Sequence, residues 1–309
     1  MSGKSSQNWL QRQWTRLMKL RQNELGILSI NRRNLHYIYP NNHRRDFPLA
    51  DNKLTLKQYF ADSDIPMAQT LSSYGYFYEL RNLAQDLHSH PEFVIKPASG
   101  RGGGGILVVK EKTDGGWRNM GGRLITLEDI RKHIADIIFG VYSFSLNDQA
   151  IIEQRIHQHA SIDKISPNGL ADVRIILYRD KPVMHMIRIA TKDSNGTANL
   201  HQGAIGAAVD WETGTTFHAS RHGHSLDTHP DTGVSLLNIQ LPHWQRIQEL
   251  AIKIAHSVPL KYLGIDIALG QTSPYLLEIN ARPGIEIQNV NNRGLRQCLE
   301  NLTLPGGHQ

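Results

Sequence analysis

The stretch that decides the fold is LGIDIALGQTSPYLLEINARPG, residues 263–284. Two runs rich in apolar residues flank a loop at residues 270–274, a pattern typical of an antiparallel hairpin. If the loop is symmetric about Thr272, Asp266 lies directly opposite Glu278, because each is six residues from the centre. Opposed residues share one face of the sheet, so the two carboxylates would lie roughly 5 Å apart and repel each other. The sequence therefore predicts a positive charge between them.

The same hairpin has the composition of a site for a hard cation. Strand alternation places Asn280 on the side of Glu278 and points Leu277 and Ile279 into the core. Together with Asp266, these side chains offer oxygen ligands of the kind that Mg²⁺ prefers, and they leave positions for water and a substrate phosphate. The alternative is a different register, in which the polar side chains form a solvated face.

A second stretch, FVIKPASGRGGGGILVV at residues 93–109, sets Lys96 and five glycines between two apolar runs. Each glycine in an ordered element costs roughly 0.5–1 kcal/mol relative to alanine. A β-branched run, not a helix, follows the glycines, so neither the dinucleotide fingerprint nor the P-loop signature fits. We expect a glycine flap (residues 99–104) whose amides close over phosphate oxygens. Lys96, on the face opposite Phe93 and Ile95, would reach a phosphate beneath it. A mobile surface hairpin tip is the alternative.

Two further strands carry charged residues among apolar ones. Asp172 and Arg174 share one face of residues 171–178, and Arg188 interrupts the apolar run 182–190 in the same way. An arginine on a strand is usually just exposed. Together with Lys96, Arg282 and a dication, however, these arginines predict a cationic cleft suited to a polyphosphate.

The composition bounds the class of protein. A chain of 309 residues with 39% hydrophobic content can form one large domain or two modest ones. The single cysteine, Cys298, excludes an intramolecular disulfide framework and a multi-cysteine metal cage, and it fits a reducing compartment. Arg12, Arg16 and Lys19 interrupt the apolar residues near the N-terminus, unlike in a signal peptide, and no apolar run approaches the roughly 18 residues of a membrane span. We expect a cytoplasmic protein.

The positive charge is concentrated at the N-terminus. The net charge is +6, and residues 1–47 contain nine Lys and Arg residues against two acidic ones, which makes them a basic arm. Leu10, Trp14, Leu17 and Met18 fall on one side of a helix, and we interpret this helix as docking on the body of the protein. Contact with an acidic protein partner, RNA or a membrane is the alternative.

The remaining pattern predicts an α+β fold with antiparallel strands. The expected helices cover residues 54–60, 127–138 and 242–256, and the other expected strands cover residues 150–153 and 203–209. Residues 26–30 alone could supply a strand ahead of Lys53. Residues 191–234 are expected to be mostly loops.

Sixteen histidines raise the question of a zinc site. His157 and His159 could project from one strand face, but the histidines between residues 217 and 234 lie in a loop without an H-E-x-x-H pattern. A zinc site is therefore not favoured, and the loop 217–234 is interpreted as a contact for a substrate.

In combination, residues 263–267 and 277–284 resemble the ATP-grasp superfamily, and within it the alpha-L-glutamate ligase-like group related to RimK-type glutamate ligases. The glycine flap, Asp172-Val173-Arg174 and residues 199–203 add to a resemblance that covers roughly residues 31–292. It implies the ATP-grasp fold, in which two α+β subdomains clasp ATP. The implied division is a basic arm and truncated pre-grasp region (1–47), an N-subdomain with the flap (48–150) and a C-subdomain with the Mg²⁺-binding hairpin (151–309).

The resemblance also implies roles for individual residues. Arg174 and Arg282 would face the γ-phosphate and the acyl phosphate formed from it, and Asp266, Glu278 and Asn280 would hold Mg²⁺, with Mn²⁺ as a substitute. The residues that would bind the nucleotide are Lys53, Lys96, Ser99, Gly102, Gly103, Gly104, Glu153, Gln154, Ile156 and Asn199.

The implied function is that of an ATP- and Mg²⁺-dependent carboxylate–amine ligase, which adds glutamate or another amino acid to a peptide or small acceptor through an acyl phosphate. Such chemistry needs positioning and charge neutralisation more than a side-chain nucleophile. RimK-type ligases carry a fuller α/β domain ahead of the grasp region, so a glutamate substrate is poorly supported for this chain. The alternatives are a small-molecule kinase and a non-catalytic nucleotide-binding module.

Overall fold

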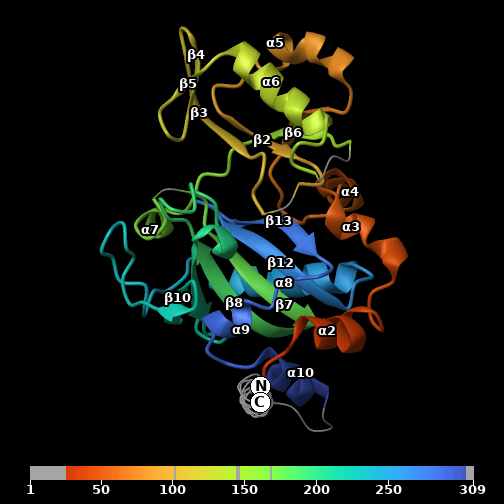
Figure 1. Ribbon diagram of the computed structural model, residues 1–309, viewed down its shortest axis with the longest axis vertical. Coiled ribbons are helices and arrows are strands. Elements are labelled where there is room, and N and C mark those ends of the chain that lie inside the picture. Colours follow the sequence, from red (N-terminus) through yellow and green to blue (C-terminus); the bar gives the residue numbers. More distant parts are fainter. Residues whose placement is uncertain (1–25, 101, 144–146, 168, 304–309) are drawn as a thin grey trace, which may run out of the picture.

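Two antiparallel sheets form the two lobes of the protein, one above the other in Figure 1. The computed structural model describes residues 26–100, 102–143, 147–167 and 169–303. The upper sheet has six strands in the order β1-β6-β2-β3-β4-β5, and the lower has seven in the order β11-β10-β9-β8-β7-β12-β13. The α+β prediction with antiparallel strands is confirmed. The helix predicted in the basic arm lies outside the described residues.

The upper lobe is a sheet covered on one face by helices. Its strands are β1 (Thr70–Tyr74), β2 (Phe93–Pro97), β3 (Leu107–Thr113), β4 (Gly116–Asn119), β5 (Leu124–Ile125) and β6 (Ala150–Glu153), and its helices are η3 (Phe77–Asn82), α5 (Leu83–Asp86) and α6 (Leu127–Ile138). Helix α6 has the predicted bounds because Thr126 and Asp129 form a capping box at its start. Ile130, Ile134 and Ile137 of α6 pack fully buried against the sheet.

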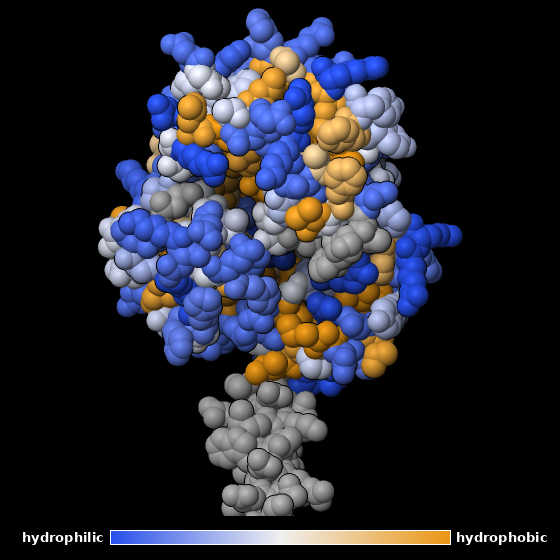
Figure 2. Space-filling model, turned by 45° about the horizontal axis from the view of Figure 1, so that its top comes forward, coloured by the Kyte–Doolittle hydropathy of each residue, from blue (hydrophilic) through white to orange (hydrophobic). Residues whose placement is uncertain are grey.

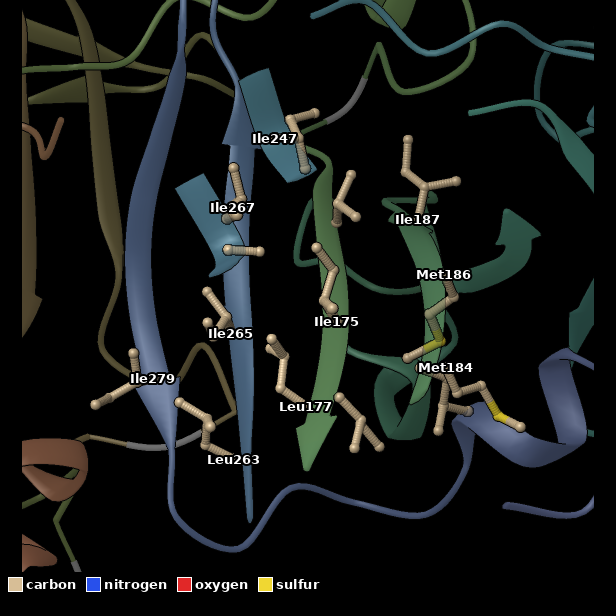
Figure 3. Packing of buried hydrophobic residues seen from close by; sticks show 14 of the residues in the cluster. Ile175, Leu177, Met184, Met186, Ile187, Ile247, Leu263, Ile265, Ile267 and Ile279 are labelled. Atoms are coloured by element: carbon tan, nitrogen blue, oxygen red, sulfur yellow. The ribbon is translucent and has the colours of Figure 1, made fainter. Parts of the chain in front are cut away.

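The lower lobe holds the larger core. Its strands are β7 (Asp172–Tyr178), β8 (Lys181–Ile189), β9 (Ile205–Val209), β10 (Thr216–Arg221), β11 (His224–Ser225), β12 (Tyr262–Leu269) and β13 (Pro274–Asn280). Figure 3 shows Ile265 and Ile267 of β12 beside Ile175 and Leu177 of β7, and α8 (Trp244–Ser257) contributes Ile247 to the same cluster. The opposite face of these strands is therefore left for polar side chains.

Several short helices complete the lower lobe. They are α2 (Ile30–Arg33), the π-helix η1 (Asn34–Ile38), η2 (Arg44–Asp46), α3 (Pro48–Asp51), α4 (Lys53–Tyr59), α7 (Ala160–Asp163), η4 (Leu200–Gln202), α9 (Ile287–Val290) and α10 (Leu295–Thr303). Leu49 and Leu56 belong to the lower core, although we assigned residues 48–59 to the N-subdomain. The proposed boundary after residue 150 falls inside β6 of the upper sheet.

The segment 26–30 forms no strand, contrary to prediction. Ile30 already begins α2, with the Ser29 hydroxyl accepting a hydrogen bond from Arg32 N at the helix start. The backbone of Leu28 instead binds the side-chain amide of Gln288, with N–O distances of 2.9 Å and 3.0 Å. The buried Gln288 side chain thus makes the hydrogen bonds with Leu28 that a neighbouring strand would otherwise make. A sequence pattern cannot reveal this substitution of one partner for another.

The register of the β12–β13 hairpin is confirmed, with Asp266 directly opposite Glu278. The prediction that Leu277 points into the core is wrong. Ile267 pairs with Leu276, so Leu277 is the extra residue of a β-bulge, and it lines a cleft between the lobes. Leu276 occupies the core position in its place, at 1% exposure, while Ile279 is buried as expected.

The surface is mostly polar. In Figure 2 the visible face is predominantly hydrophilic, with small groups of apolar side chains on both lobes. Each helix in the described part of the chain is too short or too polar to cross a membrane. The cytoplasmic location stays a prediction.

His185 of β8 is a buried titratable group at the edge of the lower core. Its ring stacks on Trp211 at a centroid distance of 5.0 Å, and its Nδ1 lies 2.6 Å from the carbonyl oxygen of Val209. Burial lowers the pKa of His185 to about 4. The folded protein therefore holds this histidine neutral at pH values where the unfolded chain protonates it.

We predict that His185 makes the protein less stable as the pH falls. Because the folded pKa lies below the unfolded value of about 6.5, this contribution is fully present above pH 6.5 and is lost between pH 6.5 and 4. Between pH 7 and pH 5, the wild type should lose about 2 kcal/mol more unfolding free energy than His185→Phe, as measured by urea denaturation. Parallel losses in the two proteins would contradict the assignment.

Candidate functional site

A cleft of about 880 Å³ lies between the two lobes. Residues from β2, β3, β7, β8, β12 and β13 line it, together with the segment that follows β6 and the loop before η4. The cleft brings together most of the residues predicted from sequence: Lys53, Lys96, Gly102, Gly103, Gly104, Glu153, Gln154, Ile156, Arg174, Asn199, Asp266, Glu278 and Asn280.

Two predicted site residues lie outside the cleft lining. The amide of Ser99 donates to the Asp148 carboxylate at 3.0 Å and 3.1 Å, and its hydroxyl accepts from Asn52 at 3.2 Å. Arg282 binds both carboxylate oxygens of Asp51 at 2.7 Å and lies over the ring of Phe47. A phosphate-facing role for Arg282 therefore remains a prediction, and this arrangement would have to open to permit it.

The centre of the cleft is a network of two arginines and two aspartates on adjacent strands. Arg174, opposite Asp266 in the β7–β12 pair, binds the Asp266 carboxylate through Nε and through Nη2, the latter at 2.6 Å. Arg188 donates to Asp266 at 2.8 Å and to both oxygens of Asp172 at 2.7 Å and 2.8 Å. The positive charge expected beside Asp266 is thus supplied by guanidinium groups.

Burial and charge act in opposite directions on the two aspartates. Burial by itself would raise the pKa of Asp266, but the Arg174 and Arg188 guanidiniums outweigh it and lower that pKa to about 2. Burial raises the pKa of Asp172 to about 6, against the attraction of Arg188 and with the help of the Asp266 charge. Asp266 is therefore the carboxylate that stays ionised.

The side chains of Asp266, Glu278 and Asn280 lie together, and their role as ligands of a hard cation stays a prediction. Asn280 Nδ2 lies 3.5 Å from Asp266 Oδ2 and 3.5 Å from Glu278 Oε1. In the part of the chain that is described, no group of three or more His, Cys, Asp or Glu residues could hold a metal ion. Two carboxylates and one amide oxygen fit a cation such as Mg²⁺, provided that water and substrate oxygens complete its shell.

Lys53 joins this site to the glycine flap. It begins α4, where the Asn52 side chain caps the helix by accepting from the amides of Leu54 and Thr55. Its Nζ lies 3.4 Å from Glu278 Oε2 and donates to the Gly100 carbonyl at 3.1 Å. An ammonium group in this place can neutralise an anion held under the flap.

A second buried charge cluster joins strands of the upper sheet to α4. Glu153 is 4% exposed, and its carboxylate forms ion pairs with Lys96 and, at 3.0 Å, with Lys57. Although burial acts to raise the pKa of Glu153, the two ammonium groups lower it overall. Phe93 and Ile95 are fully buried on the other face of β2, as predicted. Glu153 is therefore the counter-ion of both lysines.

The glycine flap is fastened to the lower lobe. The carbonyl oxygen of Gly102 accepts hydrogen bonds from Asn199 Nδ2 at 2.9 Å and from Gln202 Nε2 at 3.2 Å. Gly102 has a φ of 64°, and a Cβ there would lie 2.9 Å from Asn199 Nδ2. Glycine is required because the backbone is left-handed and the loop of the other lobe approaches closely. We call these two hydrogen bonds the flap latch.

Sequence reasoning missed or underused four residues of this site. Arg188 was placed in the cationic cleft but given no specific role, although a lone arginine in an apolar strand was the signal. Lys57 lies four residues after Lys53, on the same face of α4, and that spacing could have revealed it. Gln202 of the flap latch and the bulged Leu277 left no such signal, because their positions depend on tertiary contacts.

Comparison with models of known protein families identifies one family that matches the chain. The model of a family described as sugar-transfer associated ATP-grasp matches residues 32–303. None of the curated proteins matches the chain.

Several solved structures are similar. The ATP-grasp ligase PsnB in complex with a minimal precursor is 13% identical, with a TM-score of 0.44, over 84% of this chain and 62% of that chain. D-alanyl-alanine synthetase A from Vibrio cholerae is 15% identical, with a TM-score of 0.48, over 82% and 63% of the two chains. A RimK domain ATP-grasp protein from Sphaerobacter thermophilus is 12% identical, with a TM-score of 0.48, over 85% and 71%. The chain thus spans less than two thirds of the length of the first two of these proteins.

We predict that Glu153→Gln strongly destabilises the protein. The substitution leaves two buried ammonium groups without a counter-charge, which should cost about 3 kcal/mol of unfolding free energy by urea denaturation. Glu92→Gln is the matched control, because Glu92 pairs with Arg155 and His157 but is 31% exposed, and it should cost less than about 1 kcal/mol. Equal losses of unfolding free energy in the two variants would show that the buried Glu153 cluster contributes no more to stability than the ion pairs of Glu92.

We also predict that the flap latch slows opening of the flap. The double substitution Asn199→Ala with Gln202→Ala removes both donors to the Gly102 carbonyl, so exchange of the Ile106 amide hydrogen, which is donated to the Gly103 carbonyl, should accelerate by about tenfold or more. His201→Ala is the control, because this residue lies between the two donors and its ring makes no hydrogen bond to any described residue. Unchanged exchange in the double variant would refute the latch.

Proposed function

Because the chain belongs to the sugar-transfer associated ATP-grasp family, we propose that it is an ATP- and Mg²⁺-dependent carboxylate–amine ligase. The γ-phosphoryl group of ATP passes to a carboxylate and gives an acyl phosphate and ADP. The amine nitrogen then forms a bond to the acyl carbon, the bond from that carbon to the phosphate oxygen breaks, and phosphate leaves with the electron pair while the amine loses a proton. The product is an amide.

The observation that carries this proposal is the convergence of opposite charges in one cleft. Lys53 and Lys96 line the cleft, the glycine flap lies beside them, and the face of β12 and β13 presents Asp266 and Glu278. Transfer of a phosphoryl group depends on positioning and on neutralising phosphate charge, and these residues supply both. Mg²⁺ held by Asp266, Glu278 and Asn280 would neutralise further phosphate charge.

The ion pairs of the cleft suit an exchange of partners on substrate binding. Without a polyphosphate, Arg174 and Arg188 are neutralised by Asp266 and Asp172, and Lys96 by Glu153. On binding of a nucleotide with its metal ion, the carboxylates would hold the metal ion and the guanidiniums would bind phosphate. Each charge would keep a partner, which would avoid the cost of a buried unpaired ion.

The two substrates of the ligase are an acid and an amine. Because the family is described as sugar-transfer associated, we include amino sugars as one class of amine, beside amino acids and short peptides. The glycine flap excludes water from the acyl phosphate, which water would otherwise hydrolyse.

We predict that Glu278→Ala abolishes turnover, with at least a 100-fold loss of Mg²⁺-dependent ADP release. Glu278 is the better target because its side chain is 33% exposed and its one ion pair among the described residues is with Lys53, whereas replacing Asp266 would remove the carboxylate shared by Arg174 and Arg188. The assay takes a panel of amino acids, peptides and other carboxylates, with hydroxylamine as the surrogate amine and Mn²⁺ as the alternative metal ion. Glu249→Gln, on the exposed face of α8, is the control.

The outcomes separate the reaction classes. A hydroxamate formed with one class of acid, and lost in Glu278→Ala, identifies acyl-phosphate chemistry. ADP release with a stable phosphorylated product and no hydroxamate would point to a kinase. ATP binding without ADP release for any acid, in a protein with unchanged thermal unfolding, would argue against an enzyme.

A further inference from the structure

A second cavity of about 210 Å³ opens beside the cleft. It lies between the β10–β11 hairpin and the segment around α9, and His201 lines both cavities. The two spaces therefore adjoin at this histidine. None of the residues to which we assigned a role in phosphoryl transfer lines the second cavity.

Strand pairing places the cavity on the same side of the sheet as the charged network. Ser220 of β10 pairs with Gly206 of β9, which pairs with Arg188 of β8. Directly opposed residues share a face, so Ser220 and Arg188 point the same way, two strand spacings or about 10 Å apart. Gly206 leaves room between them for Val290, whose Cγ2 would lie 2.5 Å from a Cβ at position 206. A group in the cavity is thus within reach of the reacting centre.

The cavity presents polar side chains that lack partners. Ser220 is 6% exposed, and its hydroxyl has no hydrogen-bond partner among the described residues; the same holds for the rings of His201 and His222. Glu286 accepts one hydrogen bond, from Asn289 at 2.9 Å, and forms no ion pair with a described residue. His201 and His222 are exposed and Glu286 is half-buried, so water hydrates these groups in the open cavity, and a ligand that displaces this water can take over their hydrogen bonds.

Backbone geometry holds one of these groups over the cavity. His222 and Gly223 form the turn between β10 and β11, with φ values of 51° and 79°. Positive φ at both residues is the ordinary geometry of a two-residue type I′ hairpin turn, and this turn places His222 at the rim of the cavity.

The lining indicates the chemistry of the ligand. Serine, histidine and asparagine side chains both donate and accept hydrogen bonds, as sugar hydroxyls do, and Glu286 adds an acceptor. The lining contains no lysine or arginine, which disfavours a phosphate or carboxylate ligand. Leu200 and Val290 offer an apolar wall for ring carbons. At about 30 Å³ per water, the volume equals roughly seven waters, which is the size of one sugar ring.

We propose that this cavity binds the hydroxyl-bearing ring of an amino sugar that serves as the amine substrate. The proposal rests on the proposed ligase function and names the substrate class for it. The ring occupies the second cavity, and its amine projects past His201 into the cleft, where the nitrogen attacks the acyl phosphate. The products are an amide-linked sugar, ADP and phosphate.

The test compares a hydroxyl-bearing ring amine with a ring amine that has no hydroxyl group, at equal concentrations of the unprotonated amine, because glucosamine is the weaker base. Glucosamine and cyclohexylamine share the ring size, and hydroxylamine needs no ring site at all. The variants are Ser220→Ala and Glu286→Gln, and the control is Glu212→Gln, an exposed glutamate that lines neither cavity. With the acid found by hydroxamate formation, we expect each variant to lower kcat/KM for glucosamine by about tenfold, and to leave hydroxamate formation unchanged.

The wild type should also use glucosamine at least tenfold better than cyclohexylamine. Equal use of the two amines, or an unchanged kcat/KM for glucosamine in both variants, overturns the proposal while the ligase function stands. If the wild type forms no hydroxamate with any acid, the ligase function itself fails. Calorimetric titration of glucosamine onto the full chain then decides on the cavity: binding weakened about tenfold in Ser220→Ala supports a sugar site, and no binding to the wild type refutes it.

Discussion

The structure depends on keeping every buried charge of the cleft in contact with an opposite one. Asp266 is 1% exposed in a strand whose other face is the hydrophobic core, so it can stay ionised only because Arg174 and Arg188 contact it. Each arginine comes from a strand on the same side of β12, and Asp172 balances the second of them. The order of the strands in the lower sheet therefore decides which charged side chains lie next to one another in the site.

Besides the buried Lys57–Glu153 ion pair, weaker polar contacts join the two lobes. Asn199 and Gln202 hold the Gly102 carbonyl, and Lys53 reaches both the glycine flap and Glu278. Hydrogen bonds of this sort contribute about 1 kcal/mol each, far less than the packing of either core. The core of each lobe is thus fixed, whereas the closure between them is adjustable. A site that must admit a nucleotide and then exclude water needs this combination.

The sequence allowed most of the fold and many of the cleft residues to be predicted. Alternation placed Lys96 on the face opposite Phe93 and Ile95, a conclusion that rests on the local two-residue period of a strand. The assumed symmetry about Thr272 gave the right partner for Asp266, but the observed loop pairs Leu269 with Pro274, and the bulge at Leu277 brings Glu278 opposite Asp266. The failures involve distant partners: Leu277 left the core because a bulge intervened, and residues 26–30 docked on Gln288 instead of forming a strand. Arg282 pairs with Asp51, 231 residues away in the chain.

By itself, the sequence determined which faces of the strands are polar, where the glycine flap lies and that Asp266 and Glu278 stand opposite each other on β12 and β13. These features follow from local periodicity and from the chemistry of single residues. Only the tertiary structure decided which charges neutralise one another, that Glu153 serves two lysines, and that Ser220, His222 and Glu286 enclose a second cavity. Such arrangements join residues far apart in the chain, and their energies depend on burial and distance, which exist only once the chain has folded.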